Sequence, residues 1–292
     1  MKVNPKISII IPRFLFMECS ATKNYPYVQN FEPTEACLNS IKKQDYKNIE
    51  VILANPKNCR SGFEAKNKAV KKAKGDIILF MCPESVMVKN NELSNLIKIF
   101  NKTKADAVGC SSIANKDMNL FIWLLESEVE IRESMMREGW TDIASWSYMA
   151  IKKSVFDEIG GFPKDSPTIN LANKWAGSIW GDWDFCSLLK EKKYKIWHTN
   201  KVHFYHYYRT DFDSYFKKQF NHAWYNVAFY KRFGKSDDYT HHAFIPRLDH
   251  RRTKSKKIFL LIPIALLRYV SWVLGAAKGV WDFYIMKKYL SS

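Results

Sequence analysis

The sequence is poor in cysteine and in acidic residues. Its 292 residues include six cysteines, with no CxxC pair and no close Cys/His quartet. This pattern argues against structural zinc and a disulfide scaffold, and suits a reducing compartment. MKVNPK leads directly into ISIIIP without the apolar region of a signal peptide, so we expect no secretory signal. Internal repeats, low-complexity tracts and recognised nucleic-acid motifs are also absent from the sequence.

The charge balance is strongly basic. Lysine and arginine number 46 against 29 acids, a formal net charge of +17, and 47% of residues are hydrophobic. The apolar content is ample for one or two domains with a core. The charge points to an anionic partner: nucleic acid, an anionic membrane or a phosphorylated substrate. Because the densest basic run, 247–257, adjoins an apolar segment, the pattern favours the membrane over nucleic acid.

Apolar runs alternate with helical patterns over the first 113 residues. Strands are predicted at 7–12, 49–54, 77–81 and 106–113. Helices are predicted at 34–44, at 64–74 and from about 91. This order predicts a parallel sheet wrapped by helices. Gly75 is expected at the C′ position of the helix that ends at Lys74.

The second half of the chain is less regular. Further elements are predicted at 120–137 (helix), 147–151 (strand), 182–194 (helix), 195–200 (strand) and 214–233 (helix). The run 77–81 is followed at once by Cys82, Pro83 and Glu84. A carboxylate just past a buried strand lies where open α/β sheets bind their ligands.

Five segments carry a resemblance to a known family: ISIIIP, ACLNSIKKQDYKNIEVILA, EAKNKAVKKAKGDIILF, VFDEIGGF and GDWDFCSLLKEKKYKIWH. In this order, over roughly residues 7–234, they resemble the family-2 glycosyltransferases, which transfer sugars from nucleotide diphosphates. The resemblance implies an α/β fold of GT-A type, with a mostly parallel sheet flanked by helices. It places a catalytic domain at 1–213, with a nucleotide-binding half at about 1–113 and an acceptor half at about 114–213.

In that family the turn after the third strand reads Asp-x-Asp, and its last Asp binds a divalent metal on the donor diphosphate. Here the turn is Cys82-Pro83-Glu84, which keeps a carboxylate at the metal-binding position. The resemblance implies that Glu84 and His206 bind a divalent cation, Mn²⁺ or Mg²⁺. His203 is the alternative, because residues of odd separation lie on opposite faces of a strand. Cys82 departs from the oxygen ligands that these ions prefer.

The resemblance also supplies a catalytic base. Gly181-Asp182 stands where the family has a Glu-Asp pair, so Asp182 is expected to accept the proton of the acceptor hydroxyl. Asp is also a good helix N-cap, and the two roles are compatible. The residues expected to contact the nucleotide-sugar are Pro12, Arg13, Asn55, Lys66, Asn67, Cys82 and Pro83.

Residues 214–292 are expected to form a helical, membrane-associating part. The segment 258–277 carries one charge, and a polar stripe follows one side of the predicted helix: Arg268, Ser271, Gly275, Lys278 and Asp282. A long helix of this kind suits the surface of an anionic membrane, on its cytoplasmic face. The alternative is a tilted single span whose stripe faces protein.

Together these features predict an inverting glycosyltransferase that uses a nucleotide-diphospho-sugar donor and a lipid-linked or cell-surface glycan acceptor. Because the family motifs are altered, the alternative is a non-catalytic relative that binds glycan or scaffolds a partner.

Overall fold

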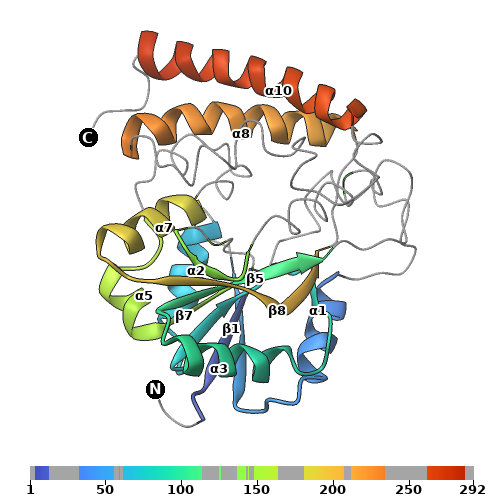
Figure 1. Ribbon diagram of the computed structural model, residues 1–292, viewed down its shortest axis with the longest axis vertical. Helices are drawn as coiled ribbons and strands as arrows, with labels where there is room; N and C mark the ends of the chain where they lie inside the picture. The colour runs from blue at the N-terminus through green and yellow to red at the C-terminus, as the bar shows by residue number, and fades with distance from the viewer. Residues whose placement is uncertain are drawn as a thin grey trace.

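The structure is a computed structural model that describes residues 4–12, 33–55, 59, 62–113, 125, 137–142, 144, 148–163, 181–206, 212–233 and 262–286. Figure 1 shows a sheet with helices on both faces and, beyond it, two long helices side by side. These are α8 (Phe212–Phe233) and α10 (Ile262–Val280), and α10 continues into the π-helical turn η6 (Trp281–Ile285). Arg13, the basic run 247–257 and most of the predicted helix 120–137 lie outside the described residues.

The sheet has eight strands within the described part of the chain. Their order is β2-β1-β3-β7-β5-β8-β4, with β6 paired to β8. Their bounds are β1 (Ile7–Pro12), β2 (Ile49–Ala54), β3 (Ile77–Phe80), β4 (Ser85–Met87), β5 (Ala107–Ile113), β6 (Gly139–Thr141), β7 (Met149–Lys152) and β8 (Ile196–His206).

One edge of the sheet collects the carboxyl ends of five strands. β2, β1 and β3 are parallel, with Ile7 opposite both Ile49 and Ile77. β7 lies antiparallel between β3 and β5, and β5 is parallel to β8. Two antiparallel steps restore the original direction, so β1, β2, β3, β5 and β8 all end at the same edge. The predicted α/β sheet flanked by helices is confirmed, and the antiparallel direction of β7 makes it a mixed sheet.

Helices cover both faces of the sheet. Their bounds are α1 (Pro33–Lys42), α2 (Gly62–Val70), α3 (Glu92–Thr103), α5 (Lys153–Ile159) and α7 (Gly181–Glu191). Every residue of β3 is fully buried, and its side chains alternate between two cores. Ile78 and Phe80 pack with α2, α5 and α7, whereas Ile77 and Leu79 pack with α1 and α3. The uninterrupted apolar run of β3 therefore matches its burial on both faces.

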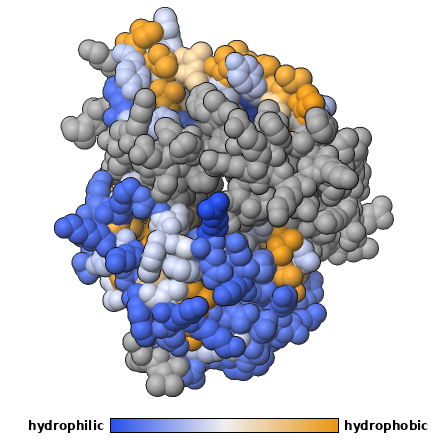
Figure 2. Space-filling view, viewed as in Figure 1, coloured by the Kyte–Doolittle hydropathy of each residue, from blue (hydrophilic) through white to orange (hydrophobic). Residues whose placement is uncertain are grey.

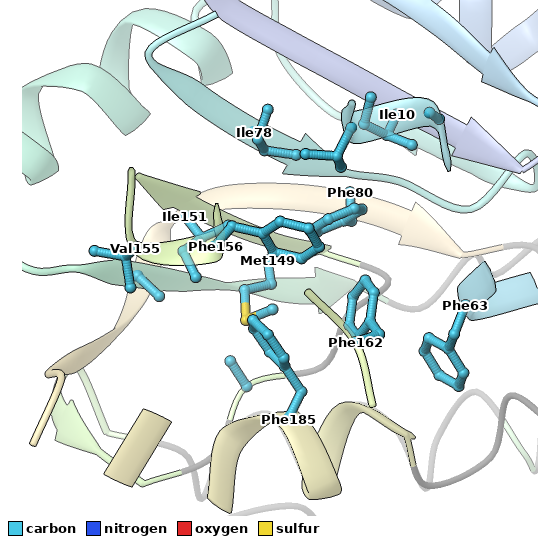
Figure 3. Close-up of a cluster of buried hydrophobic side chains, with 14 of the residues drawn as sticks. Ile10, Phe63, Ile78, Phe80, Met149, Ile151, Val155, Phe156, Phe162 and Phe185 are labelled. Atoms are coloured by element: carbon cyan, nitrogen blue, oxygen red, sulfur yellow. The ribbon is translucent and has the colours of Figure 1, made fainter. Parts of the chain in front are cut away.

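An aromatic cluster joins the end of β3 to α5 and α7 (Figure 3). The Phe162 ring centroid lies 5.0 Å from that of Phe80 and 4.8 Å from that of Phe185. The Phe156 ring contacts all three, with centroid distances of 5.4 to 5.5 Å. Such ring pairs contribute about 1 kcal/mol each beyond their buried area. The cluster fixes the start of α7 relative to the end of β3.

Gly75 does not end a helix, contrary to the sequence prediction. α2 ends at Val70, so Gly75 lies five residues beyond it. The Gly75 amide instead donates a hydrogen bond to Ser8 Oγ at 2.8 Å. A Cβ at this position would lie 2.4 Å from Ser8 Oγ and 2.6 Å from the Ser8 nitrogen. Glycine is required because the chain passes directly against β1.

Glu50 anchors the same corner of the sheet, and its removal should destabilise the fold. Glu50 Oε1 accepts hydrogen bonds from Ser8 Oγ at 2.5 Å and from the Lys74 amide at 2.6 Å. Its Oε2 pairs with Lys6 Nζ at 3.0 Å. Burial raises the pKa of Glu50, but these hydrogen bonds outweigh it and lower the pKa to about 2. We expect Glu50→Gln to lower the free energy of unfolding by about 3 kcal/mol at pH 7.

The loss should depend on pH with a defined sign. Because the folded pKa of Glu50 lies below its ordinary value of 4.5, its contribution is full above pH 4.5 and is lost as the pH falls toward 2. Urea unfolding of both proteins between pH 7 and 3 should show the difference shrinking. Glu64→Gln is the control, because the ion pair of Glu64 with half-exposed Lys68, at 3.0 Å, is worth under about 1 kcal/mol. A difference that stays constant with pH would contradict the assignment.

Three members of the polar stripe of the C-terminal helix, Ser271, Gly275 and Asp282, face protein, whereas Lys278 is 51% exposed. Ser271 is fully buried and Asp282 is 2% exposed. Trp224 Nε1 in α8 donates a hydrogen bond to Asp282 Oδ2 at 3.1 Å. A Cβ on Gly275 would lie 2.1 Å from the Phe220 carbonyl oxygen, so the two helices approach closely. Small residues permit such contact between helix backbones.

The outer side of α10 and η6 is apolar and exposed. Eleven large hydrophobic residues there are at least 46% exposed: Ile262, Leu266, Tyr269, Val270, Val273, Leu274, Val280, Trp281, Tyr284, Ile285 and Met286. Figure 2 shows this apolar surface over α10, whereas the sheet domain is mostly hydrophilic in the same view. Among the described residues, no helix is both long and apolar enough to cross a membrane.

Candidate active site

The turn after β3 lies at the shared carboxyl edge of the sheet. β4 begins directly after Glu84 and pairs antiparallel with the end of β8, with Ser85 opposite His206. This pairing places His206 beside Glu84, with Nε2 3.8 Å from Oε1 and each side chain 17% exposed. The strand β4 was not predicted, because three residues after a proline turn have no period of their own. Its pairing brings together two residues that are 122 positions apart in the printed sequence.

Cys82 completes a cluster with these two side chains. One ligand atom from each of Cys82, Glu84 and His206 lies within 4.8 Å of the other two. Cys82 is buried at 3% exposure, whereas Glu84 and His206 are only partly covered. A carboxylate oxygen, an imidazole nitrogen and a sulfur at such separations can bind one divalent ion together. The predicted pair Glu84 and His206 is therefore adjacent, with a sulfur ligand beside it.

The register of β8 separates His206 from His203. The His203 amide donates to Glu92 Oε2 at 3.0 Å, and its carbonyl accepts from the Val88 amide at 3.2 Å. Burial, together with the charge of Lys89, lowers the pKa of His203. The backbone of His203 is thus bonded to Glu92, the first residue of α3. Of the two histidines, it is His206 that lies in the cluster with Glu84.

Two further residues support the cluster and were not predicted from the sequence. The Tyr148 ring lies 5.9 Å from the His206 ring and is nearly perpendicular to it. Cys37 Sγ in α1 donates to the Cys82 carbonyl at 3.7 Å. Burial and the Glu84 carboxylate raise the pKa of Cys37 to about 12, so its thiol keeps the proton that it donates. In the sequence, Cys37 was recognisable only as part of an apolar helix face.

Several predicted nucleotide contacts share the same edge. Pro12 is buried at the end of β1, opposite Ala54 of β2, and exposed Asn55 follows directly. Cys82 and Pro83 follow the neighbouring strand β3 and are both buried. The parallel strands bring these positions to one side of the sheet, where α/β folds bind nucleotides. The predicted contact of Arg13 lies outside the described residues.

Lys66 and Asn67 lie in α2, and the contacts that they make are structural. Asn67 Oδ1 accepts the Phe162 amide and Asn67 Nδ2 donates to the Phe162 carbonyl, both at 2.9 Å. These bonds fix the Gly160–Phe162 turn, where a Cβ on Gly161 would lie 2.6 Å from Asn67 Oδ1. Lys66 is 1% exposed, with Nζ 4.9 Å from the Phe63 ring centroid. Their nucleotide contacts stay predictions, and the contacts of Asn67 hold the turn before Phe162 in place.

The start of α7 lies toward the same edge of the sheet as the turn that carries Glu84. α7 begins at Gly181, so Asp182 is its second residue; the Asp182 side chain is outside the described part of the structure. The helix packs on the sheet through Phe185 and Leu189 and leads by a short turn into β8. Because β8 ends at the carboxyl edge, it starts at the opposite edge, and α7 ends close to that start. An 11-residue helix is about 16 Å long, so the first residues of α7 lie back toward the carboxyl edge. The backbone of Asp182 is thus placed toward the edge where β3 ends.

Comparison with known proteins finds similarity both in sequence and in structure. No protein-family model matches the chain. The O-antigen chain rhamnosyltransferase RfbN of Salmonella typhimurium is 26% identical over 128 residues, 41% of each chain. WbaN of Salmonella anatum, also an O-antigen chain rhamnosyltransferase, is 24% identical over 152 residues, 47% of this chain and 48% of its own. The matches thus span less than half the length of these curated relatives.

One solved structure matches nearly the whole chain. The mannosyltransferase PcManGT of Pyrobaculum calidifontis, in complex with GDP-Man and Mn²⁺, has a TM-score of 0.54 and 16% identity. The superposition covers 96% of this chain and 88% of that one. At this identity the likeness establishes the fold. The resemblance of the chain to the glycosyltransferases is therefore confirmed, in sequence over less than half its length and in fold over nearly all of it.

Proposed function

We propose that the chain is an inverting glycosyltransferase that takes a sugar from a nucleotide-diphospho-sugar. The observation that carries the proposal is the cluster of Cys82, Glu84 and His206 at the carboxyl edge of the sheet. Strand ends, a carboxylate and an imidazole meet at the place where this fold binds a nucleotide diphosphate. The relatives and the neighbour named above, all sugar transferases, support the same reaction class.

The residues have distinct roles in this reaction. Glu84 and His206 would hold a divalent cation, which would neutralise charge on the departing diphosphate. Their side chains fit metal binding, since a carboxylate oxygen and an imidazole nitrogen lie 3.8 Å apart. Asp182 accepts the proton of the acceptor hydroxyl as its oxygen bonds to the anomeric carbon. The bond from that carbon to the diphosphate breaks on the opposite side, so the configuration inverts.

The acceptor that we propose is a lipid-linked or cell-surface glycan. Two sequence relatives are named for the O-antigen chain, a surface polysaccharide. A lipid-linked acceptor lies at a membrane, and the exposed apolar side of α10 and η6 gives the enzyme a surface that can lie on one. We place this contact at the cytoplasmic face, where nucleotide-sugars are made. The basic run 247–257 would add attraction to anionic lipid.

Donor turnover tests the reaction class. The purified chain, incubated with a panel of UDP-, GDP- and dTDP-sugars, is expected to release nucleoside diphosphate from at least one of them. The release should increase with an added divalent cation and fall when a chelator is present. Chromatography of the nucleotide products measures it, and heat-denatured protein is the control.

The altered motifs leave a second candidate, a non-catalytic relative that binds glycan or scaffolds a partner. Asn55 follows the second strand where the family has acids, and Gly181 replaces the first acid of the Glu-Asp pair. A protein that binds a nucleotide-sugar but turns over no member of the panel, with or without the cation, would favour this candidate and contradict transfer.

A further inference from the structure

The cluster of Cys82, Glu84 and His206 offers three different kinds of ligand atom. Cys82 contributes sulfur, Glu84 oxygen and His206 nitrogen, all within 4.8 Å of one another. Mg²⁺ and Mn²⁺ favour oxygen ligands, whereas sulfur combined with imidazole favours Zn²⁺ and ions of similar softness. A cysteine at this position therefore changes which ion the cluster selects.

The separations suit a small tetrahedral ion. Around an ion with ligand bonds of about 2.0–2.3 Å, neighbouring ligand atoms lie roughly 3.3–3.7 Å apart. His206 Nε2 is already 3.8 Å from Glu84 Oε1, and the widest separation in the cluster is at most 4.8 Å. Side-chain shifts of about 1 Å bring all three atoms to bonding distance. Three protein ligands leave a fourth position open for a phosphate oxygen or water.

The backbone around the cluster is already fixed. Cys82 follows the fully buried strand β3, and its carbonyl accepts a hydrogen bond from Cys37 Sγ. His206 is held by the pairing of β8 with β4, opposite Ser85. A site carried on paired strands needs little ordering when an ion binds.

We propose that Cys82, Glu84 and His206 bind a thiophilic divalent ion of the Zn²⁺ class in preference to Mn²⁺ or Mg²⁺. Binding forms a metal–sulfur bond and releases the thiol proton to water, without a change of oxidation state. The inference rests on the proposed function in one respect only: that a phosphate of the sugar donor occupies the fourth coordination position of the ion. Ion binding itself is measurable in the absence of any sugar donor.

Titration of the metal-free protein with Co²⁺ tests the sulfur ligand. Thiolate ligation gives Co²⁺ an intense charge-transfer absorption that oxygen and nitrogen ligands do not give. We expect this band to saturate at one ion per chain, and Zn²⁺ to displace Co²⁺ far more effectively than Mn²⁺ does. Cys82→Ser should abolish the band and weaken Zn²⁺ binding by at least roughly 10–100-fold. Cys59→Ser, which alters a partly buried cysteine outside the cluster, should change neither.

Cys82→Asp is the complementary variant, because it restores the first Asp of the family's Asp-x-Asp turn and offers oxygen in place of sulfur. Its Mn²⁺ affinity, followed by electron paramagnetic resonance, should rise and its Zn²⁺ affinity should fall, which a merely misfolded variant would not show. Absence of the charge-transfer band in the native protein, or equal displacement by Mn²⁺ and Zn²⁺, overturns the inference. Sugar transfer supported by Mn²⁺ without that band overturns this inference alone, whereas Co²⁺ bound through Cys82 without any transfer overturns only the proposed function.

Discussion

Replacing Asp182 by Asn is expected to lower the rate of sugar transfer by about 10²–10⁴-fold, the usual contribution of a positioned general base. Asn keeps the size and polarity of the side chain but cannot accept the proton of the acceptor hydroxyl. Because this interaction forms only as the hydroxyl attacks, the loss should fall on kcat, with donor affinity nearly unchanged. Product release measured under saturating donor, together with calorimetric donor binding, separates the two quantities.

The chain offers a matched control for this variant. Asp213 is the second residue of α8, just as Asp182 is the second residue of α7. A carboxylate in the first turn stabilises either helix through the helix dipole, so both variants lose that contribution. Asp213 is 71% exposed and pairs only with Lys217 at 2.6 Å among the contacts described. Asp213→Asn should leave transfer unchanged. Full activity in Asp182→Asn would exclude its role as base, and equal losses in both variants would trace the effect to helix stability.

The apolar runs predicted the central strands well because those strands are buried on both faces. β1 and β2 have the predicted bounds, and β3 stops one residue earlier than expected. Position within the sheet was not predictable in the same way. Val51 and Leu53 in β2 are 38% and 43% exposed, because β2 is the edge of the sheet. An apolar run does not reveal whether a second neighbour will pair with it.

The candidate site was predictable only in part, since two of its features depend on long-range pairing. Glu84 was identified from its place after the third strand. The choice between His203 and His206 required the register of β4 against β8, which three residues of local sequence do not determine. The contact of Cys37 with Cys82 likewise depends on how α1 packs against β3. Local patterns find the elements, and the packing between elements then selects the residues.

The C-terminal helix shows the same limit. Periodicity predicted its polar stripe, but a stripe can face water or protein. In the structure Ser271 is buried and Gly275 packs against α8, whereas many apolar residues on the opposite side are exposed. This orientation is the reverse of an ordinary surface helix, whose apolar side faces the core. The two-helix unit therefore buries Ser271 and Asp282 together with apolar Ile264 and Trp272, and presents further hydrophobic residues outward.

Replacing Leu266, Val270 and Leu274 together by Glu is expected to release the chain from anionic vesicles. The three side chains are 49–61% exposed and follow each other every four residues along the outer side of α10. Transferring a half-exposed aliphatic side chain from water into lipid contributes about 1 kcal/mol. Loss of three such contributions corresponds to a fall in binding on the order of a hundredfold. Glu also adds repulsion from anionic headgroups.

Lipid fits this surface better than another protein because of its charge and its orientation. The chain carries +17, and the basic run 247–257 directly precedes the apolar helix in sequence. Polar groups that a protein partner could pair with, such as Asp282, are turned toward α8. What remains outside is largely apolar and includes Trp281 and Tyr284, residue types common where membrane meets water.

Vesicle sedimentation at low and high salt measures the binding. The native chain should bind anionic vesicles more tightly than neutral ones and weaken as salt rises, because the charges at the membrane are screened. Val51→Glu combined with Leu53→Glu is the control, since both side chains are exposed on β2, in the sheet domain rather than on α10. This control should bind normally. If the α10 variant also binds normally, lipid does not contact this face. If the native chain is a dimer without vesicles and the α10 variant is a monomer by light scattering, a second copy covers the face instead.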